Sequence, residues 1–417
     1  MIAAPGVAAE VTATITSPAA VSVPWDVVVV GAGPAGTAAA ARIAARGARV
    51  LLIDRRRFPR AKVCGCCLSA RAIRELVALD ASIIEDATPL DAAWIAHRGR
   101  SIRIPLPAGR VVSRETLDSR LIRHAISAGC HWLPGANVVG IDDRSDGGDS
   151  ASVMLQDDVP AAAGLQVIST RTIVLATGLA DGVRIGGRGR TNGASGRRID
   201  SRSRIGVGAT LPAAACGLSR GELVMVVARG GYCGIVRLED GRIDVAAALD
   251  RSLLAGGTAP AGAVARLLDQ AARHATIDLP GAAAILAAPF RATPPLTRHA
   301  PLVAGASRRI LRIGDAAGYV EPFTGEGIGW ALASGRILAE SILATGEPRP
   351  ASDVAARYVA MHRRELAANH ARCRLVARGL RLPTVVAAAV AAAGALPWAT
   401  RRLVPMVIGD TSTGARG

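Results

Sequence analysis

The sequence predicts an α/β fold that combines a Rossmann-like nucleotide-binding domain with an inserted antiparallel β-sheet lobe and a helical C-terminal region. Three observations lead to this prediction. Residues Trp25 to Arg57 read as a buried strand, a glycine turn, an alanine-rich helix and a second strand. Residues Arg204 to Leu249 alternate as the strands of a sheet do. The chain from about Ala351 onward has a helical pattern.

The first unit carries a glycine pattern that is typical of dinucleotide binding. In WDVVVVGAGPAGTAAAARIAARGARVLLIDRRR, we expect Gly31 to form the tight turn, Gly33 to let the backbone approach a pyrophosphate, and Gly36 to allow close helix-to-strand packing. Asp54 ends the second strand, where its carboxylate can accept a hydrogen bond from a ribose hydroxyl. A glycine-rich turn without a ligand is the alternative, and the pattern alone does not separate FAD from NAD.

A second acidic strand end lies far along the chain. The segment RRILRIGDAAG predicts a strand over Ile310 to Ile313 that runs into Gly314 and Asp315, and a helix over about Gly325 to Leu343 follows. The carboxylate of Asp315 can accept a hydrogen bond from a sugar-chain hydroxyl. The free N–H groups around Gly325 to Ile328 offer a partial positive charge to an anion.

Four features in this order resemble the FAD-dependent flavoprotein monooxygenase and geranylgeranyl reductase superfamily: GAGPAG, Asp54, ATGLADG at Ala176 to Gly182, and GDAAGYVEPFTGEGI from Gly314. Their spacing spans nearly the whole chain. The resemblance implies an FAD-binding domain of the GR2 type, in which Asp315 binds the ribityl chain and the Pro-x-Thr-Gly-Glu-Gly segment lies against the isoalloxazine. The positions assigned to this second contact and the adjoining helix start are Pro322, Gly325, Glu326, Gly327 and Ile328.

The loop FPRAKVCGCCLS resembles the Lys-x-Cys-Gly loop of geranylgeranyl reductases. Lys62, Cys64 and Gly65 match this pattern, whereas Cys66 and Cys67 stand where the family usually has a small residue or glycine. Three thiols within four positions suggest a metal site, but neither a second cysteine pair nor a spaced histidine pair accompanies them. We therefore expect a loop packed near the cofactor and no metal.

A helix is predicted from the segment SRETLDSRLIRHAISAG, which has apolar residues at helical spacing after a capping residue, Ser113. The family resemblance implies that the next residue, Arg114, contacts FAD. An ordinary solvated arginine is the alternative for this position.

The family resemblance places the substrate lobe around GGYCGIVRLEDGRIDVAAAL. Geranylgeranyl reductases often carry Tyr-x-Trp-x-Phe-Pro there, and only Tyr232 matches in this sequence. The Trp-x-Trp-x-Ile-Pro segment and lobe lysine of flavin halogenases are missing as well. No residue identifies itself as acid or base, so Tyr232, Cys64 and Glu326 are catalytic candidates that each have a structural role as the alternative. Tyr319 and Phe323 either line the flavin and substrate pocket or belong to the core.

Composition limits the partners. The formal charge of +17 does not indicate nucleic acid, because Lys62 is the only lysine, the arginines are scattered, and aromatic residues make up only 3%. An anionic cofactor or a membrane surface would use the same charge. Seven cysteines, an odd number, predict free thiols and a cytoplasmic location.

The predicted organisation has five parts. They are a disordered N-terminal arm (1–24), the first part of the FAD-binding domain (25–200), a substrate-binding lobe (201–300), the second part of the FAD-binding domain (301–350) and a C-terminal helical region (351–417). The arm lacks the basic start of a signal peptide. In the last part, the uncharged segment Leu382 to Ala399 is bracketed by Pro383 and Pro397, which favours a core or interface helix over a membrane span. Flanking arginines leave peripheral membrane contact as the alternative.

We expect an FAD-dependent oxidoreductase whose flavin is reduced by NAD(P)H. Only one dinucleotide fingerprint is visible, so NAD(P)H is expected to bind without its own Rossmann domain. The predicted reaction is hydroxylation of an apolar or aromatic small molecule by a monooxygenase, because most of the reductase signature around Tyr232 is missing. The alternatives are a geranylgeranyl-reductase-like enzyme that reduces carbon–carbon double bonds of a prenyl or lipid substrate, and a non-enzymatic lipid or prenyl binder. The sequence does not predict the oligomeric state.

Overall fold

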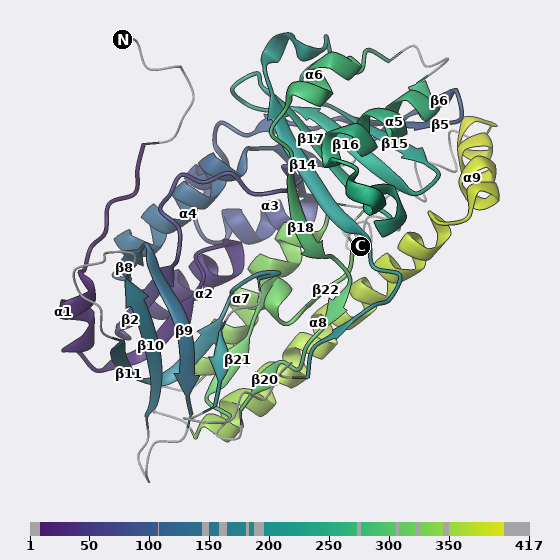
Figure 1. Cartoon of the computed structure of the whole chain (residues 1–417). Helices are drawn as coiled ribbons and strands as arrows, with labels where there is room; N and C mark the ends of the chain where they lie inside the picture. Colours follow the sequence, from purple (N-terminus) through teal and green to yellow (C-terminus); the bar gives the residue numbers. More distant parts are fainter. Residues whose placement is uncertain are drawn as a thin grey trace, which may run out of the picture.

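The computed structural model shows a nucleotide-binding half and a second sheet side by side, with the long helix α8 (Ala351–Gly379) running from one toward the other (Figure 1). The structure describes residues 9–106, 108–143, 150–157, 165–180, 183–186, 196–272, 277–305, 308–321, 323, 325–344 and 350–395. The termini and several connecting segments lie outside these ranges.

The nucleotide-binding half is built on a sheet with five parallel strands in the order β8–β2–β1–β11–β21. Its central strands are runs of Val, Ile and Leu that are buried on both faces, as parallel strands covered by helices must be. Strands β9 and β10 extend β11 as an antiparallel meander, and β12 pairs with β9. The strands are β1 (Trp25–Val30), β2 (Val50–Asp54), β8 (His131–Pro134), β9 (Ala136–Asp142), β10 (Ala151–Asp157), β11 (Gln166–Leu175), β12 (Arg184–Ile185), β20 (Val303–Ala304) and β21 (Ile310–Arg312).

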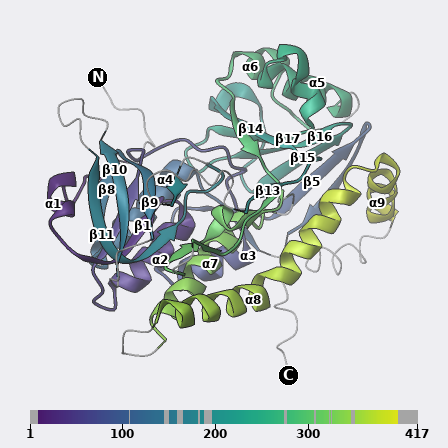
Figure 2. The ribbon, with the colours of Figure 1, turned by 60° about the horizontal axis from the view of Figure 1, so that its bottom comes forward.

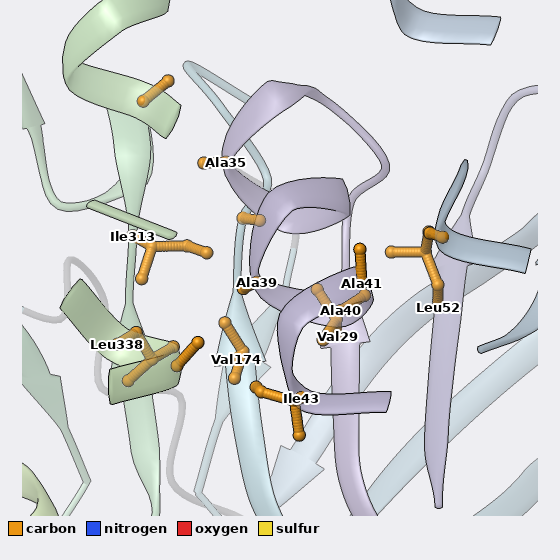
Figure 3. Close-up of a cluster of buried hydrophobic side chains, with 14 of the residues drawn as sticks. Val29, Ala35, Ala39, Ala40, Ala41, Ile43, Leu52, Val174, Ile313 and Leu338 are labelled. Atoms are coloured by element: carbon orange, nitrogen blue, oxygen red, sulfur yellow. The ribbon is translucent and has the colours of Figure 1, made fainter. Parts of the chain in front are cut away.

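Small side chains let the helices approach this sheet closely. Helix α2 (Pro34–Ala44) is alanine-rich and almost wholly buried between the sheet and α7 (Gly327–Ile342). Gly335 of α7 lies so near α2 that a side-chain carbon there would meet the carbonyl oxygen of Ala35 at 2.5 Å. Figure 3 shows the resulting core, in which Val29, Leu52 and Leu338 pack around α2. Helices α3 (Ala70–Val77) and α4 (Arg114–Ser127) complete this half.

The second sheet has the order β18–β14–β17–β16–β15–β5–β6 and is antiparallel except for the β15–β5 pair. Helices α5 (Pro260–Ala272) and α6 (Ala282–Ala287) cover one face with apolar side chains. Strands β5 and β6 come from residues 92–105, which the sequence analysis had assigned to the nucleotide-binding part. The strands are β5 (Ala92–His97), β6 (Arg100–Pro105), β14 (Ile205–Leu211), β15 (Glu222–Ala228), β16 (Gly231–Arg237), β17 (Ile243–Leu249) and β18 (Arg291–Pro295).

The expectation of a disordered arm is wrong for residues 9–24. This segment contains α1 (Ser17–Val21), and Val11 and Ala20 are buried against the nucleotide-binding half. The backbone of Thr14 and Val11 hydrogen-bonds to Trp132, so the segment is held by specific contacts that composition does not reveal. Residues 1–8 lie outside the described ranges.

The C-terminal region is helical over its described residues, 351–395, as predicted, and residues 396–417 lie outside the described ranges. Helix α8 is followed after a short break by α9 (Pro383–Ala395), and Figure 2 shows α9 at the far end of α8, near β5. No single helix in the described ranges is long and apolar enough to span a membrane, whereas the bent pair α8–α9, which turns by 102°, meets that criterion by length and composition. The remaining elements are β3 (Cys67–Ser69), β4 (Thr88–Pro89), β7 (Gly109–Val111), β13 (Arg198–Ile199), β19 (Arg298–His299), β22 (Gly318–Tyr319) and short 3-10 turns. The predicted fold class is confirmed.

Candidate cofactor and substrate site

A cavity of about 2050 Å³ lies between the nucleotide-binding half and the second sheet. Its wall includes the β1–α2 turn, the loop after β2, strands β5, β15 and β16, the start of α7, and the α8–α9 elbow. The structure brings most of the predicted site residues to this wall: Gly31, Gly33, Asp54, Cys64, Arg114, Tyr232, Asp315, Gly325, Gly327 and Ile328. Gly36 and Glu326 do not border the cavity, and Pro322 falls outside the described residues.

The three glycines of the β1–α2 turn have different surroundings. Gly31 has φ = 110°, and a side chain there would collide with the carbonyl group of Ala176. A side chain at Gly36 would collide with the carbonyl oxygen of Gly31, so this glycine is required for close packing of α2. Nothing lies within 4 Å of the position that a side chain at Gly33 would take. The backbone is therefore open to the cavity where α2 begins, and a pyrophosphate can approach it.

Asp54 is held at the end of β2 by two backbone donors. Its Oδ2 accepts a hydrogen bond from the Ala32 N–H at 2.9 Å, and its Oδ1 accepts one from the Arg56 N–H at 2.9 Å. Arg60 lies 3.7 Å from the same carboxylate and stacks over Phe58. The carboxylate is thus fixed beside the open turn, where a ribose would lie.

The only lysine of the chain faces the second acidic strand end. Burial lowers the pKa of Lys62, and burial raises the pKa of Asp315, while the charge of each group counteracts the shift of the other. The Nζ of Lys62 is 3.6 Å from the position that a side chain at Gly178 would take. Sequence reasoning matched Lys62 to a family loop but gave it no role. The signal that could have indicated a role for Lys62 is its rarity. Lys and Arg together number 50, and Lys62 is the only lysine among them.

The start of α7 offers backbone donors to the cavity. Its first residue, Gly327, and the following Ile328 border the cavity, and no side chain caps this helix end. Glu326, a predicted catalytic candidate, instead pairs with Arg71 of α3 at 3.7 Å. Burial raises the pKa of the Glu326 carboxyl, and Arg71 opposes this shift. Glu326 therefore joins α7 to α3 and does not face the reacting groups.

The thiol loop brings a charged cysteine to the cavity wall. A hydrogen bond from the Cys66 side chain, assisted by the charge of Arg114, outweighs burial and lowers the pKa of Cys64 to about 5. Arg114 is almost wholly buried, and two hydrogen bonds of 3.0 and 2.8 Å fix its guanidinium on Asp118. The alternative of a solvated arginine is wrong, because Arg114 lies inside and stabilises the Cys64 thiolate. No disulfide bond joins any of the seven cysteines, all of which the structure describes.

Two tyrosines supply neutral hydroxyl groups. Tyr232 packs edge-on against Phe323 at a centroid distance of 5.1 Å, with the Arg204 guanidinium 5.5 Å from its ring centre. Burial raises the pKa of both Tyr232 and Tyr319, so both phenols stay protonated near neutral pH. Tyr319 and Phe323 border the cavity. Of the two roles that the sequence left open for them, pocket lining and core packing, the structure therefore supports pocket lining.

A buried ion-pair network ties the second sheet to the C-terminal elbow. Arg204 bonds to Glu321 at 2.8 Å and to Asp250 at 2.9 Å, and Arg381 reaches both carboxylates, at 3.5 and 3.0 Å. Sequence reasoning missed this network, because its members are widely separated along the chain and belong to no local motif. It holds the segment after β22 against α8.

These features fit FAD. The open glycine turn and Asp54 suit an adenosine diphosphate, while Asp315, Lys62 and the uncapped start of α7 suit the remaining, flavin-bearing part. Among the described residues, no group of three or more His, Cys, Asp or Glu side chains is placed to hold a metal ion. The fold and the site thus define an FAD-binding oxidoreductase.

The model of the pyridine nucleotide-disulphide oxidoreductase family matches residues 25–236, and the chain belongs to this family. A menaquinone reductase of Mycolicibacterium smegmatis is 31% identical over 337 residues, which cover 77% of this chain and 77% of that protein. A geranylgeranyl diphosphate reductase of Rhodobacter capsulatus is 32% identical over 161 residues, 33% of this chain and 40% of that protein.

Solved structures share the fold over almost the whole chain. The flavin-dependent brominase Bmp2 superposes with a TM-score of 0.71 at 17% identity, over 93% of this chain and 94% of its own. A geranylgeranyl bacteriochlorophyll reductase-like protein of Thermoplasma acidophilum has a TM-score of 0.66 at 17% identity, over 92% and 91%. The predicted superfamily is confirmed, and the chain is an FAD-dependent oxidoreductase enzyme.

Proposed function

We propose that this enzyme reduces a carbon–carbon double bond in the isoprenoid chain of a quinone or a similar lipid. The observation that carries this proposal is the cavity, which continues from the glycine turn of β1 along the second sheet to α9. Its far part is lined by apolar side chains, among them Ile95, Met225, Val386 and Val390. Such a long apolar space suits a flexible hydrocarbon chain, whereas a small aromatic ring would leave much of it unfilled.

The relatives support the same reaction class. One protein that aligns with 77% of this chain is named a menaquinone reductase, and another relative is named a geranylgeranyl diphosphate reductase. Both names describe reductions of molecules that carry isoprenoid chains.

The reaction divides the work between cofactor and protein. FAD, when bound and reduced, supplies the hydride. The chain must exclude water, hold the double bond in place and deliver a proton to the second carbon. Cys64 borders the cavity, and its pKa is lowered to about 5, so it is a thiolate near neutral pH and we assign the proton to a neutral phenol of the pocket. Tyr232 and Tyr319 keep their protons and line the pocket that holds the chain.

One observation favours the hydroxylation expected from the sequence. Of the reductase signature in the second sheet only Tyr232 matches, so the pocket differs from the family pattern at the positions that follow it. Hydroxylation remains the second candidate.

The proposed electron donor is NAD(P)H. The described residues contain one dinucleotide-binding βαβ unit, formed by β1, α2 and β2, and we assign it to FAD. The nicotinamide nucleotide would then bind transiently beside the loop that follows β2. Arg55, Arg57 and Arg291 line the cavity there and are available for its phosphates. The family name is consistent with such a donor. Bleaching of the flavin absorbance by NADH or NADPH, followed separately in rapid mixing, identifies which nucleotide serves.

The reaction is tested by turnover with NAD(P)H and a menaquinone in the absence of O₂. We expect a product that has gained two hydrogen atoms, identified by mass spectrometry. A second reaction under isotopically heavy O₂ is the matched experiment. Product that forms only with O₂ and carries one labelled oxygen atom would exclude the reductase and establish the hydroxylase.

We further propose that the substrate enters at the α8–α9 elbow from an anionic membrane surface. Leu375, Leu382 and Val385 are exposed there although they border the cavity mouth, and the exposed side chains of Arg374 and Arg378 lie beside them. Exposed apolar side chains next to cations are typical of shallow contact with anionic lipids.

A further inference from the structure

A row of cavity-lining residues crosses the second sheet from β17 to β6. Gly234 of β16 lies opposite Ala246 of β17 on one side and opposite Met225 of β15 on the other. The row continues through Ile95 of β5 to Ile102 of β6, and all of its members border the cavity. Neighbouring strands lie about 4.8 Å apart, so the row forms a strip of the cavity wall about 19 Å long.

The row leads from the cofactor end of the cavity to α9. Tyr232 lies two positions before Gly234 on the same face of β16, and its ring packs against Phe323, which precedes the start of α7. At the other end, a side-chain carbon at Gly394 of α9 would lie 3.6 Å from the side chain of Ile102. A hydrocarbon chain that extends from α9 toward the start of α7 therefore crosses Gly234 before it reaches the flavin-bearing part of FAD.

Gly234 is the one member of this row without a side chain. Its φ lies outside the left-handed region, so the backbone does not require a glycine here, and a glycine inside a strand weakens the strand. A side-chain carbon at this position would lie 3.1 Å from the Sδ of Met225 and 3.8 Å from the carbonyl oxygen of Ala246. The space that Gly234 leaves is therefore about as large as a methyl group, and the thioether of Met225 occupies part of it.

Met225 is suited to leave this space when a ligand enters. A methionine side chain is unbranched and flexible, so it adapts to the shape of its neighbours. Met225 borders the cavity and belongs to the apolar cluster that contains Tyr232 and Val386 of α9. Rotation of its side chain away from Gly234 would open the space without any movement of the strands.

We propose that Gly234 and Ala246 form a pocket for one methyl branch of the substrate chain, and that Met225 closes this pocket when it is empty. The pocket selects a branched isoprenoid chain over a straight hydrocarbon chain, because only the branched chain fills it. Its place beside Tyr232 also holds the branched carbon near the cofactor end of the cavity. This inference rests on the proposed function, which takes the substrate chain to be an isoprenoid.

The test compares two saturated alcohols that bind but cannot be reduced. Phytanol and hexadecanol have the same main chain, and phytanol alone carries methyl branches. The affinity of the FAD-loaded protein for each alcohol is measured by the change in flavin fluorescence, in the same neutral detergent. We expect Gly234→Ala to lower the ratio of the phytanol affinity to the hexadecanol affinity about fourfold, because one buried methyl group contributes about this factor.

Gly262→Ala on α5 is the matched control, since nothing lies within 4 Å of the added methyl group and Gly262 does not border the cavity. This variant should keep the wild-type ratio. Ala246→Val fills the same pocket from the opposite strand, so it should lower the ratio even if Gly234→Ala is unstable. A wild-type ratio in both pocket variants overturns the inference.

The proposed function fails separately. If the wild-type protein reduces no menaquinone while the pocket variants still lower the ratio of affinities, the reaction is wrong and the methyl pocket is supported. Reduction of menaquinone together with an unchanged ratio supports the reaction and overturns the pocket.

Discussion

Asp315 illustrates how the fold fixes the position of one predicted cofactor-binding residue. It follows β21 and borders the cavity, and the Gly314 before it has φ = 57° and donates its N–H to the Ser334 hydroxyl of α7 at 2.8 Å. The strand end, the turn and the helix thus fix the position of one carboxylate. Burial raises its pKa, and the charges of Lys62, Arg114 and Arg298 oppose that shift.

We expect Asp315→Ala to weaken FAD binding by about 10- to 150-fold. The reason is that a hydrogen bond to a charged group contributes about 1.5–3 kcal/mol, and about 1.4 kcal/mol corresponds to a tenfold change. Titration of the apoprotein with FAD, followed by flavin fluorescence, measures the change. Asp353→Ala, at the exposed start of α8, is the control. An affinity equal to that of the wild type would remove Asp315 from the cofactor site.

Residue-level prediction succeeds where a local motif sets the geometry. Gly31, Gly36 and Asp54 belong to one βαβ unit, so their spacing defines the collisions and hydrogen bonds that the structure contains. The left-handed backbone of Cys66 was not predicted, because it depends on how the loop after β2 packs on β16.

At the scale of elements, α8 contributes two half-buried histidines: His370 packs against α7, and His362 lies 6.3 Å from His370 between ring centres. His370 packs edge-on against Trp330 at a centroid distance of 4.7 Å, and His362 packs against Tyr358 at 5.6 Å. Burial lowers the pKa of each imidazole from 6.5 to about 4. Both rings are therefore neutral in the folded protein near neutral pH.

These histidines make stability depend on pH. Below about pH 6.5 the unfolded chain binds protons that the folded rings exclude, so the free energy of unfolding should fall as the pH decreases from about 6.5 to about 4. Urea unfolding curves across this window measure the effect. In the double variant His362→Gln and His370→Gln the decline should become shallower, whereas His131→Gln, at an exposed position, should leave it unchanged. An unaltered slope in the double variant would contradict the assignment.

The second sheet shows where element prediction needs the tertiary structure. Strands β14 to β17 follow one another and were expected from the alternation after Arg204. Strands β5 and β6 join the same sheet from more than 100 residues upstream, through the parallel β5–β15 pair. A parallel neighbour needs a long crossover, so adjacency along the chain does not reveal it.

At the scale of the whole molecule, the α8–α9 elbow is the place where we propose that the substrate enters the cavity. Leu375 is 70% exposed and Leu382 is 53% exposed, although both border the cavity. Arg204, Glu321 and Arg381 anchor the elbow to the second sheet. These ion pairs fix the elbow beside the exposed side chains of Arg374 and Arg378.

We expect Leu382→Asp to weaken sedimentation of the protein with vesicles that contain anionic phospholipid. The physical reason is the loss of apolar area and the addition of a negative charge at the contact. Leu286→Asp on α6 is the matched control, because Leu286 is also exposed, and α6 covers the face of the second sheet opposite the face on which α9 packs. Equal sedimentation of the wild type and both variants would place the contact elsewhere or exclude it.

The sequence by itself determined the FAD-binding fold and the glycine turn with its acidic strand end, because both depend on glycines, acids and strand patterns at short, regular spacing. The tertiary structure decided the rest. It packed residues 9–24 on the sheet, turned Glu326 toward Arg71, buried Arg114 beside Cys64 and joined Arg204 to Glu321. These contacts join segments that are far apart in the chain, and their energies come from burial and charge in a shared interior, which no single segment contains.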